Sequence, residues 1–366
     1  MPMAVTRSHI SLPPPPLPCP WLVFNHGEHG KYSTQTFFNT SQDTYVMGRI
    51  PELCDKMIVT CSHGWLVLLD LEYDDCFLLN PVSMEKIMLP PLQYFPFFCC
   101  ILSSPPTDPN CALIFVCREK PSAMFCHLGD DEWTEQHLRS AEYFRSATVC
   151  GGKIYGITLD GTLLTVDDVG SNLVVTELGS EKAPNPSIPG TSRLDENLVD
   201  SCGELFIVVK SYLGMTMKIR DMEVYKMDFS RLLWTKVDSL GDRTFFLCIT
   251  GNSFSCSAAE SGIKHNSIYY LEGNDRDLYV FDLENYSISF STPCPLQTSC
   301  RDLHYSLSDF VFNLNQIRVC IGGGSDGLDL WSEVCCAYNL PLFAALLLFV
   351  LWLLVGFSPT LVDEFA

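Results

Sequence analysis

The sequence predicts an all-β protein folded as a β-propeller, and three observations indicate this. Short apolar runs alternate with Gly, Asn, Asp and Pro through most of residues 20–300, a pattern typical of antiparallel strands joined by tight turns. A unit of several strands recurs at a spacing near the roughly 50 residues of a propeller blade. No long amphipathic pattern interrupts the series, which argues against a parallel α/β sheet.

The most informative stretch is residues 56–92, which reads as one complete meander. Four short apolar strands are predicted there, at Met57–Thr60, Trp65–Leu69, Cys76–Leu79 and Lys86–Leu89. Turn residues separate them, beginning with Ser62–Gly64. Four strands in so short a span are about one blade, and no catalytic or metal-binding pattern accompanies them.

The pattern continues along the chain. Further strands are predicted at Phe97–Leu102, Ala112–Cys117, Ala123–His127, Ala147–Cys150, Leu173–Glu177, Cys202–Val209, Met222–Met227, Trp234–Val237, Asn266–Tyr270 and Leu278–Asp282. Matching positions are Gly64, Gly152, Gly203 and Asn266, about 88, 51 and 63 residues apart, the first interval being two units. Six blades, or seven, therefore fit between Trp21 and Cys300.

A resemblance to one family supports this interpretation. The segments that carry it are Pro20–Phe24, His63–Val67, Leu79–Pro81, Leu89–Leu92, Trp234–Leu247, Asn252–Ser255 and Asn266–Tyr270. Together they resemble the plant KIB-type, kelch-like β-propeller over roughly residues 20–295. The resemblance implies a propeller that is usually attached to an F-box and that recognises ubiquitin-ligase substrates or docks onto a signalling kinase. Residues 1–19 are too short for an F-box, so direct binding of a Skp-type adaptor is not expected.

Propeller packing assigns a structural role to three indoles. A four-stranded sheet buries too little alone, and stacking blades around an axis covers both of its faces. Trp65, Trp133 and Trp234 are therefore expected to pack between neighbouring blades, with functional aromatic contact as the alternative.

Composition limits the partners. The formal net charge is −20, from 23 basic and 43 acidic side chains, so binding to nucleic acid is disfavoured and basic protein partners are favoured. The 18 cysteines include no C-x-x-C pair, and many lie in apolar runs, where a free thiol acts as a small hydrophobe. We expect free thiols and a cytoplasmic or nuclear protein.

The ends of the chain differ from its centre. Residues 1–19 are predicted to be a disordered Pro-rich lead, and residues 20–300 the propeller. Residues 301–336 are irregular, with a last strand within Ser308–Cys320 and a Gly-rich loop. Residues 337–366 form a hydrophobic tail, in which Leu340–Phe357 carries no charge and is long enough for a candidate transmembrane helix. The alternative is a soluble protein whose terminus is altered.

Patterns that resemble catalytic motifs have simpler explanations. Gly322–Gly327 fits both a nucleotide-binding and a serine-hydrolase pattern. The first needs a βαβ unit, and the second needs a helix after Ser325 and a later histidine. No histidine follows His304, and we interpret the segment as a loop.

Candidate metal and acid–base residues are equally isolated. His26 and His29 lie in a predicted turn, and neither they nor His127 and His137 complete a ligand set. The carboxylates at Asp74–Asp75, Asp130–Glu132 and Asp167–Asp168 fall at predicted turns, which Asp favours. The sequence therefore predicts no catalytic residue, no cofactor-binding residue and no metal ligand.

The predicted function is a non-catalytic protein-interaction propeller, whose partner, a substrate or a signalling kinase, binds its loops. One alternative is an enzyme on the same scaffold, glycan-directed or a metal oxidase. Another is an interaction protein anchored to a membrane through residues 340–357.

Overall fold

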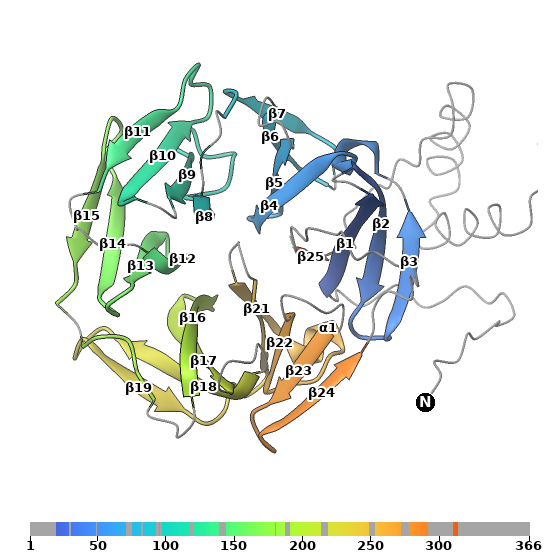
Figure 1. Cartoon of the computed structure of the whole chain (residues 1–366), viewed down its shortest axis with the longest axis vertical. Helices are drawn as coiled ribbons and strands as arrows, with labels where there is room; N and C mark the ends of the chain where they lie inside the picture. Colours follow the sequence, from blue (N-terminus) through green and yellow to red (C-terminus); the bar gives the residue numbers. More distant parts are fainter. Residues whose placement is uncertain are drawn as a thin grey trace, which may run out of the picture.

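The structure is a computed structural model, and it confirms an all-β, propeller-like fold. It describes residues 20–28, 31–48, 50–70, 75–81, 83–92, 95, 97–117, 120–138, 144–179, 181–186, 191–213, 219–248, 253–271, 278–291 and 310–313. Figure 1 shows the sheets arranged around a common centre, with one strand of each sheet nearest the middle and the others stepping outward.

The first sheet joins strands from the two ends of the described chain. Its order is β25-β1-β2-β3. The strands are β1 (Pro20–Glu28), β2 (Lys31–Asn39), β3 (Thr44–Gly48) and β25 (Phe310–Asn313). Because β25 pairs antiparallel with β1, strands far apart in the sequence complete one sheet, and the ring includes residues beyond 300.

The next three sheets are simple antiparallel meanders. The second contains β4 (Lys56–Ser62), β5 (Trp65–Asp70), β6 (Cys76–Leu79) and β7 (Lys86–Leu89). The third contains β8 (Phe97–Leu102), β9 (Ala112–Cys117), β10 (Ser122–His127) and β11 (Thr134–His137). The fourth contains β12 (Phe144–Cys150), β13 (Lys153–Thr158), β14 (Leu163–Asp168) and β15 (Leu173–Glu177).

The fifth sheet has nine strands, in the order β19-β18-β17-β16-β21-β20-β22-β23-β24. Its first four are β16 (Thr191–Ser201), β17 (Glu204–Leu213), β18 (Ile219–Asp228) and β19 (Leu233–Val237). The others are β20 (Arg243–Phe246), β21 (Ser253–Ser257), β22 (Ser267–Leu271), β23 (Leu278–Asp282) and β24 (Ser287–Ser291). Parallel pairing of β16 with β21, and of β20 with β22, joins three antiparallel runs: β19-β18-β17-β16, β21-β20 and β22-β23-β24. A short 3₁₀-helix, η1 (Pro51–Leu53), and one helical turn, α1 (Ala258–Ser261), lie between strands.

Local sequence explains the tight connections. His63 and Gly64 link β4 to β5 with φ of 52° and 78°, the left-handed values that a two-residue hairpin turn requires. Glycine adopts this conformation without steric cost. The turn predicted at Ser62–Gly64 is thereby confirmed.

Hydrophobic clusters join neighbouring sheets. One cluster packs Trp65 and Val67 of β5 against Leu113 and Phe115 of β9, with Trp133 at its margin. Another packs Trp234 of β19 against Tyr155 of β13. A further cluster joins the first sheet to the fifth. All three indoles therefore lie at contacts between neighbouring sheets, as predicted.

The strand predictions are confirmed for the segments listed above, and the last strand predicted near residue 310 is present as β25. One assignment was wrong: His26 lies inside β1, opposite Thr34, and not in a turn. It does so because β1 continues to Glu28 before the chain reverses.

Several predictions concern residues outside those described, namely His29, Asp74, the lead 1–19, Gly322–Gly327 and the hydrophobic segment Leu340–Phe357. Within the described ranges, no helix has both the length and the apolar character that crossing a membrane requires.

Candidate interaction pocket in the nine-stranded sheet

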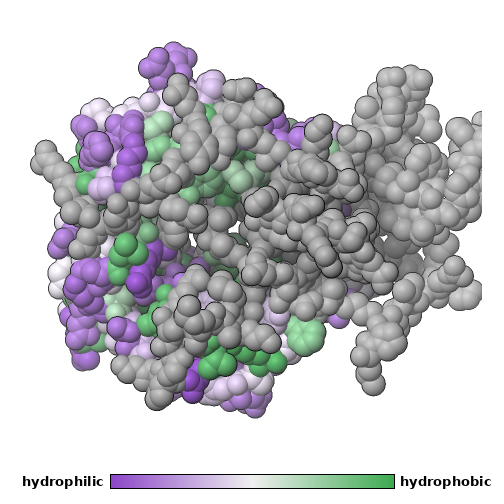
Figure 2. Space-filling model, viewed as in Figure 1, coloured by the Kyte–Doolittle hydropathy of each residue, from purple (hydrophilic) through white to green (hydrophobic). Residues whose placement is uncertain are grey.

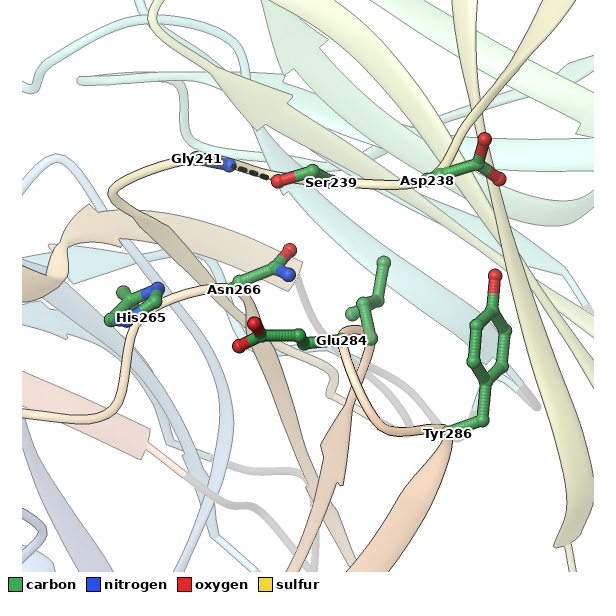
Figure 3. Close-up of a pocket in the computed structure, with 8 residues that line it drawn as sticks. Asp238, Ser239, Gly241, His265, Asn266, Glu284 and Tyr286 are labelled. Carbon is green, nitrogen blue, oxygen red and sulfur yellow. Dashed lines mark hydrogen bonds between the residues drawn. The ribbon is translucent and has the colours of Figure 1, made fainter.

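A surface pocket of about 570 Å³ lies where three connections of the nine-stranded sheet meet. Its lining residues are Asp238, Ser239, Gly241, His265, Asn266, Leu283, Glu284 and Tyr286. They come from the β19–β20 connection, the residues before β22 and the β23–β24 turn. Figure 3 shows Asp238 and Tyr286 at one end of the pocket, His265 at the other, and Asn266 and Glu284 between them.

Asn266 holds these three segments together. Its side-chain Oδ1 accepts a hydrogen bond from the Leu240 N–H at 2.8 Å. Its own N–H donates to the Arg243 carbonyl at 3.0 Å, and its carbonyl accepts from the Leu283 N–H at 3.1 Å. The residue is buried, so these bonds are shielded from water and fix the base of the pocket.

Asp282 shapes the turn that presents Glu284 and Tyr286. Its carboxylate accepts hydrogen bonds from the Glu284 N–H at 2.8 Å and from the Asn285 side chain at 2.9 Å. Lys264 lies 2.7 Å from the same group. The hydrogen bond from Lys264 is the main reason that the pKa of Asp282 is lowered to about 2, and the group is therefore ionised at neutral pH.

The pocket carries negative charge from two carboxylates, one of which, Asp238, also acts electrostatically on the nearby Lys236. Asp238 and Glu284 are exposed, and neither carboxylate forms an ion pair or a side-chain hydrogen bond with a described residue. The neighbouring cation Lys236 is bound instead to Glu223. Two free carboxylates beside a tyrosine suit a cationic group better than an anion.

An aromatic row leads from the core to the rim beside this pocket. Tyr270 of β22 stacks on Tyr279 of β23, with ring centroids 5.4 Å apart, and Tyr279 contacts Phe290 of β24 at 6.1 Å. Phe290 is 67% exposed, and Ile288 is also exposed. The row therefore ends in apolar side chains at the surface. Figure 2 shows hydrophobic residues gathered on the lower rim, where Figure 1 places β18 and β23.

A second polar cluster joins residues that the sequence left separate. His127 Nε2 lies 2.7 Å from a carboxylate oxygen of Asp168. The backbone N–H of His127 donates to the Asp130 carboxylate at 2.9 Å. Asp168 also accepts a hydrogen bond from the Gly170 N–H at 2.8 Å. The turn prediction is confirmed for Asp130, but Asp167 and Asp168 are the last residues of β14, and Asp168 bonds to the turn that follows the strand. The cluster ties β10 of one sheet to β14 of the next.

The other sequence candidates do not assemble. Among the described residues, no group of three or more His, Cys, Asp or Glu is placed to hold a metal ion. The described cysteines with free thiols include Cys76, Cys99, Cys100, Cys111, Cys117, Cys126, Cys150 and Cys202. Burial raises the pKa of the Cys61, Cys76 and Cys99 thiols to about 12, which keeps them in the unreactive protonated form.

Sequence reasoning missed the pocket residues. Asp238, Glu284 and Tyr286 lie in connections between strands whose contacts depend on how the chain returns to the same sheet. The one available signal was local: Asp282 and Asn285 flank Glu284, and both residue types favour turns.

Comparison with known proteins places these features in a family. The model of the KIB1-4 beta-propeller matches residues 37–282, more than half of the chain. One F-box/kelch-repeat protein of Arabidopsis thaliana is 23% identical over 286 residues, covering 74% of this chain and 76% of its own. Another from the same plant is 26% identical over 276 residues, covering 71% and 69%.

Among solved structures, YCF48 from Cyanidioschyzon merolae is similar at 9% identity, with a TM-score of 0.36, over 68% of this chain and 73% of that one. This likeness carries no argument about function. The match to the family model does identify the chain: its propeller belongs to the KIB1-4 beta-propeller family.

Proposed function

We propose that this protein is a non-catalytic interaction module that recognises a protein partner through the rim of its propeller. The observation that carries the proposal is the pocket in which Asp238, Glu284 and Tyr286 lie exposed on a base held rigid by Asn266. A rigid scaffold that presents polar and aromatic side chains on connections between strands is suited to binding.

Two further observations support this function. The matched relatives are named F-box/kelch-repeat proteins, so the partner class that fits is a ubiquitin-ligase substrate or a signalling kinase. His127 and Asp168, two residues of the kind that could act as acid or base, instead form a contact between neighbouring sheets. The same proposal sets the blade number at six, counting the four four-stranded sheets and dividing the nine-stranded sheet into one blade of β16–β19 and one of β20–β24.

The test is direct binding by the full chain. The immobilised protein is incubated with an extract of plant cells, and each recovered protein is then purified and mixed with it alone. We expect at least one partner to form a complex of fixed stoichiometry in analytical ultracentrifugation. Failure of every recovered protein to bind directly would contradict the proposal. A purified Skp-type adaptor serves as a comparison, and we propose that it does not bind directly.

Location in the cell is a separate part of the proposal. We propose a cytoplasmic or nuclear protein, with membrane attachment through residues 340–357 as the alternative. Cell fractionation of the full chain and of a chain ending at Ala337 distinguishes them. Equal partitioning of the two chains into the soluble fraction supports the first location, and release on shortening supports the second.

A further inference from the structure

The outer strand β24 and the pocket beside it support an inference about the chemistry of the partner, which rests on the function proposed above. In an antiparallel pair, residues directly opposite each other project from the same face. Ile288 is opposite Phe281, and Phe290 is opposite Tyr279. Phe281 is buried in the cluster that joins β22 and β23 to β17 and β18. Ile288 and Phe290 therefore face the same side as this cluster.

The exposed side chains continue into the pocket. Tyr286 precedes β24 and contacts Phe281, with ring centroids 6.2 Å apart in an edge-on arrangement. It also lines the pocket with Asp238 and Glu284. Tyr286, Ile288 and Phe290 are all more than two-fifths exposed. Together they form an apolar stripe, the β24 stripe, that ends at two free carboxylates.

The edge beside the stripe has no partner among the strands that the structure describes, because β24 is the last strand in its sheet. Exposed edge strands with apolar side chains attract further strands, and extended peptides commonly bind by adding to such an edge.

The charge of the pocket favours a basic partner over a second copy of this chain. A second copy of this chain would bring its own Asp238 and Glu284 toward the first pair, and each copy carries a net charge of −20. Such a contact is repulsive. A partner with a Lys or Arg at the position of the pocket would instead neutralise the two carboxylates.

We propose that the β24 stripe and the adjoining pocket bind one extended segment of a partner protein. The segment carries apolar side chains at alternate positions, which contact Ile288 and Phe290. It carries a Lys or Arg about four positions from the outermost of them, because same-face residues of a strand are roughly 7 Å apart and Tyr286 lies four residues from Phe290. Such a segment runs in either direction along β24.

The test uses a random peptide library displayed on phage and selected against the full chain. We expect enriched peptides with two apolar residues at alternate positions and a Lys or Arg next in the same alternation. One enriched peptide is then synthesised, and its Kd is measured by fluorescence anisotropy. The double variant D238N/E284Q should weaken binding at least tenfold and reduce its dependence on salt, since it removes charge with little change in shape.

The apolar part has its own variant and a matched control. The double variant I288T/F290T keeps residues that favour strands and should also weaken binding at least tenfold. Val174→Thr replaces an exposed apolar residue on β15, in another sheet, and should leave the Kd unchanged. Circular dichroism and melting temperature verify that each variant is folded.

Several outcomes would overturn the proposal. They are enriched peptides without a basic residue, a Kd for either double variant that equals the wild-type Kd, self-association that is lost in I288T/F290T, or tighter peptide binding by a chain ending at residue 336. The last of these would identify the chain's own tail as the occupant. A partner from the extract that binds the wild type and both double variants with the same Kd is a further outcome. That result would exclude the β24 stripe as the binding site but would leave the proposed interaction function intact.

Discussion

At the scale of single residues, the protein is stabilised by pairs of side chains that connect neighbouring sheets. Arg145 of β12 and Glu196 of β16 show this most clearly. One Arg145 nitrogen lies 2.5 and 2.7 Å from the two carboxylate oxygens of Glu196. The Glu196 side chain is 4% exposed and that of Arg145 33%. Burial raises the pKa of Glu196, and Arg145 opposes that shift without reversing it.

Because Glu196 is the more buried partner, removing Arg145 should cost a large part of the free energy of unfolding. Arg145→Met should destabilise the fold by about 3–5 kcal/mol at pH 7.5, because it leaves a buried, unpaired carboxylate. The double variant R145M/E196Q should recover most of that loss. Chemical denaturation at matched pH measures both, and an equal loss in the single and double variants would contradict the explanation.

The same pair predicts a pH dependence. A carboxyl whose folded-state pKa is raised binds its proton more tightly in the folded than in the unfolded protein, so its contribution to stability falls as pH rises above the unfolded value. In Arg145→Met the folded pKa of Glu196 should rise further. Arg145→Met should therefore lower the free energy of unfolding less at pH 4.5 than at pH 7.5. A loss that is larger at pH 4.5 would contradict this prediction.

Trp65 provides a test of packing between sheets. Its indole is 6% exposed and lies in the cluster shared by the second and third sheets. Trp65→Ala should cost about 3–5 kcal/mol, because the cavity lies where two rigid sheets meet. Met88→Ala is a suitable control, since Met88 is 55% exposed and its loss should change stability by less than about 0.5 kcal/mol. The denaturant midpoints of the two variants measure the difference.

At the scale of elements, the β23–β24 turn links stability to the pocket. Asp282 has a lowered pKa, so it favours the folded state above the unfolded value near 4 and loses this effect as pH falls toward about 2. Asp282→Asn should cost roughly 1–2 kcal/mol at pH 7. It should also lose less stability than the wild type between pH 5 and pH 2.5. Parallel acid titrations followed by tryptophan fluorescence test this, and identical acid profiles would argue against the assigned role.

The turn should also matter for binding. If Asp282 positions Glu284 and Tyr286 as its hydrogen bonds indicate, the Asn variant should bind the selected peptide more weakly even at pH 7, where it is folded. If Asp282 does not position these two residues, the Asn variant should bind the peptide with the wild-type Kd.

At the scale of the whole molecule, β25 closes the ring by pairing with β1. A chain ending at residue 305 lacks β25, while one ending at residue 316 keeps it. The shorter chain should unfold at a temperature lower by roughly 5–15 °C, because the edge of β1 loses its partner. Differential scanning calorimetry compares the two chains. Equal melting temperatures would show that β25 contributes nothing to closure.

Much of the fold follows from local pattern. Strands such as β5, β6 and β9 are rich in apolar and β-branched residues and end at turn residues, so their positions could be predicted. β16 was missed because its sequence, TSRLDENLVDS, is mostly polar. β16 lies nearest the centre of the ring, where its polar side chains reach other strands: the Asn197 side-chain amide donates to the Cys248 carbonyl at 2.9 Å.

The sequence by itself determined the all-β class, the repeated sheets and the packing role of Trp65, Trp133 and Trp234, since each depends on short-range periodicity or on burial of large apolar side chains. Only the tertiary structure decided that β25 joins β1, that Arg145 meets Glu196, and that Asp238 meets Tyr286. The physical reason is that these contacts depend on how blades close into a ring, a long-range arrangement that leaves no periodic signal in the chain.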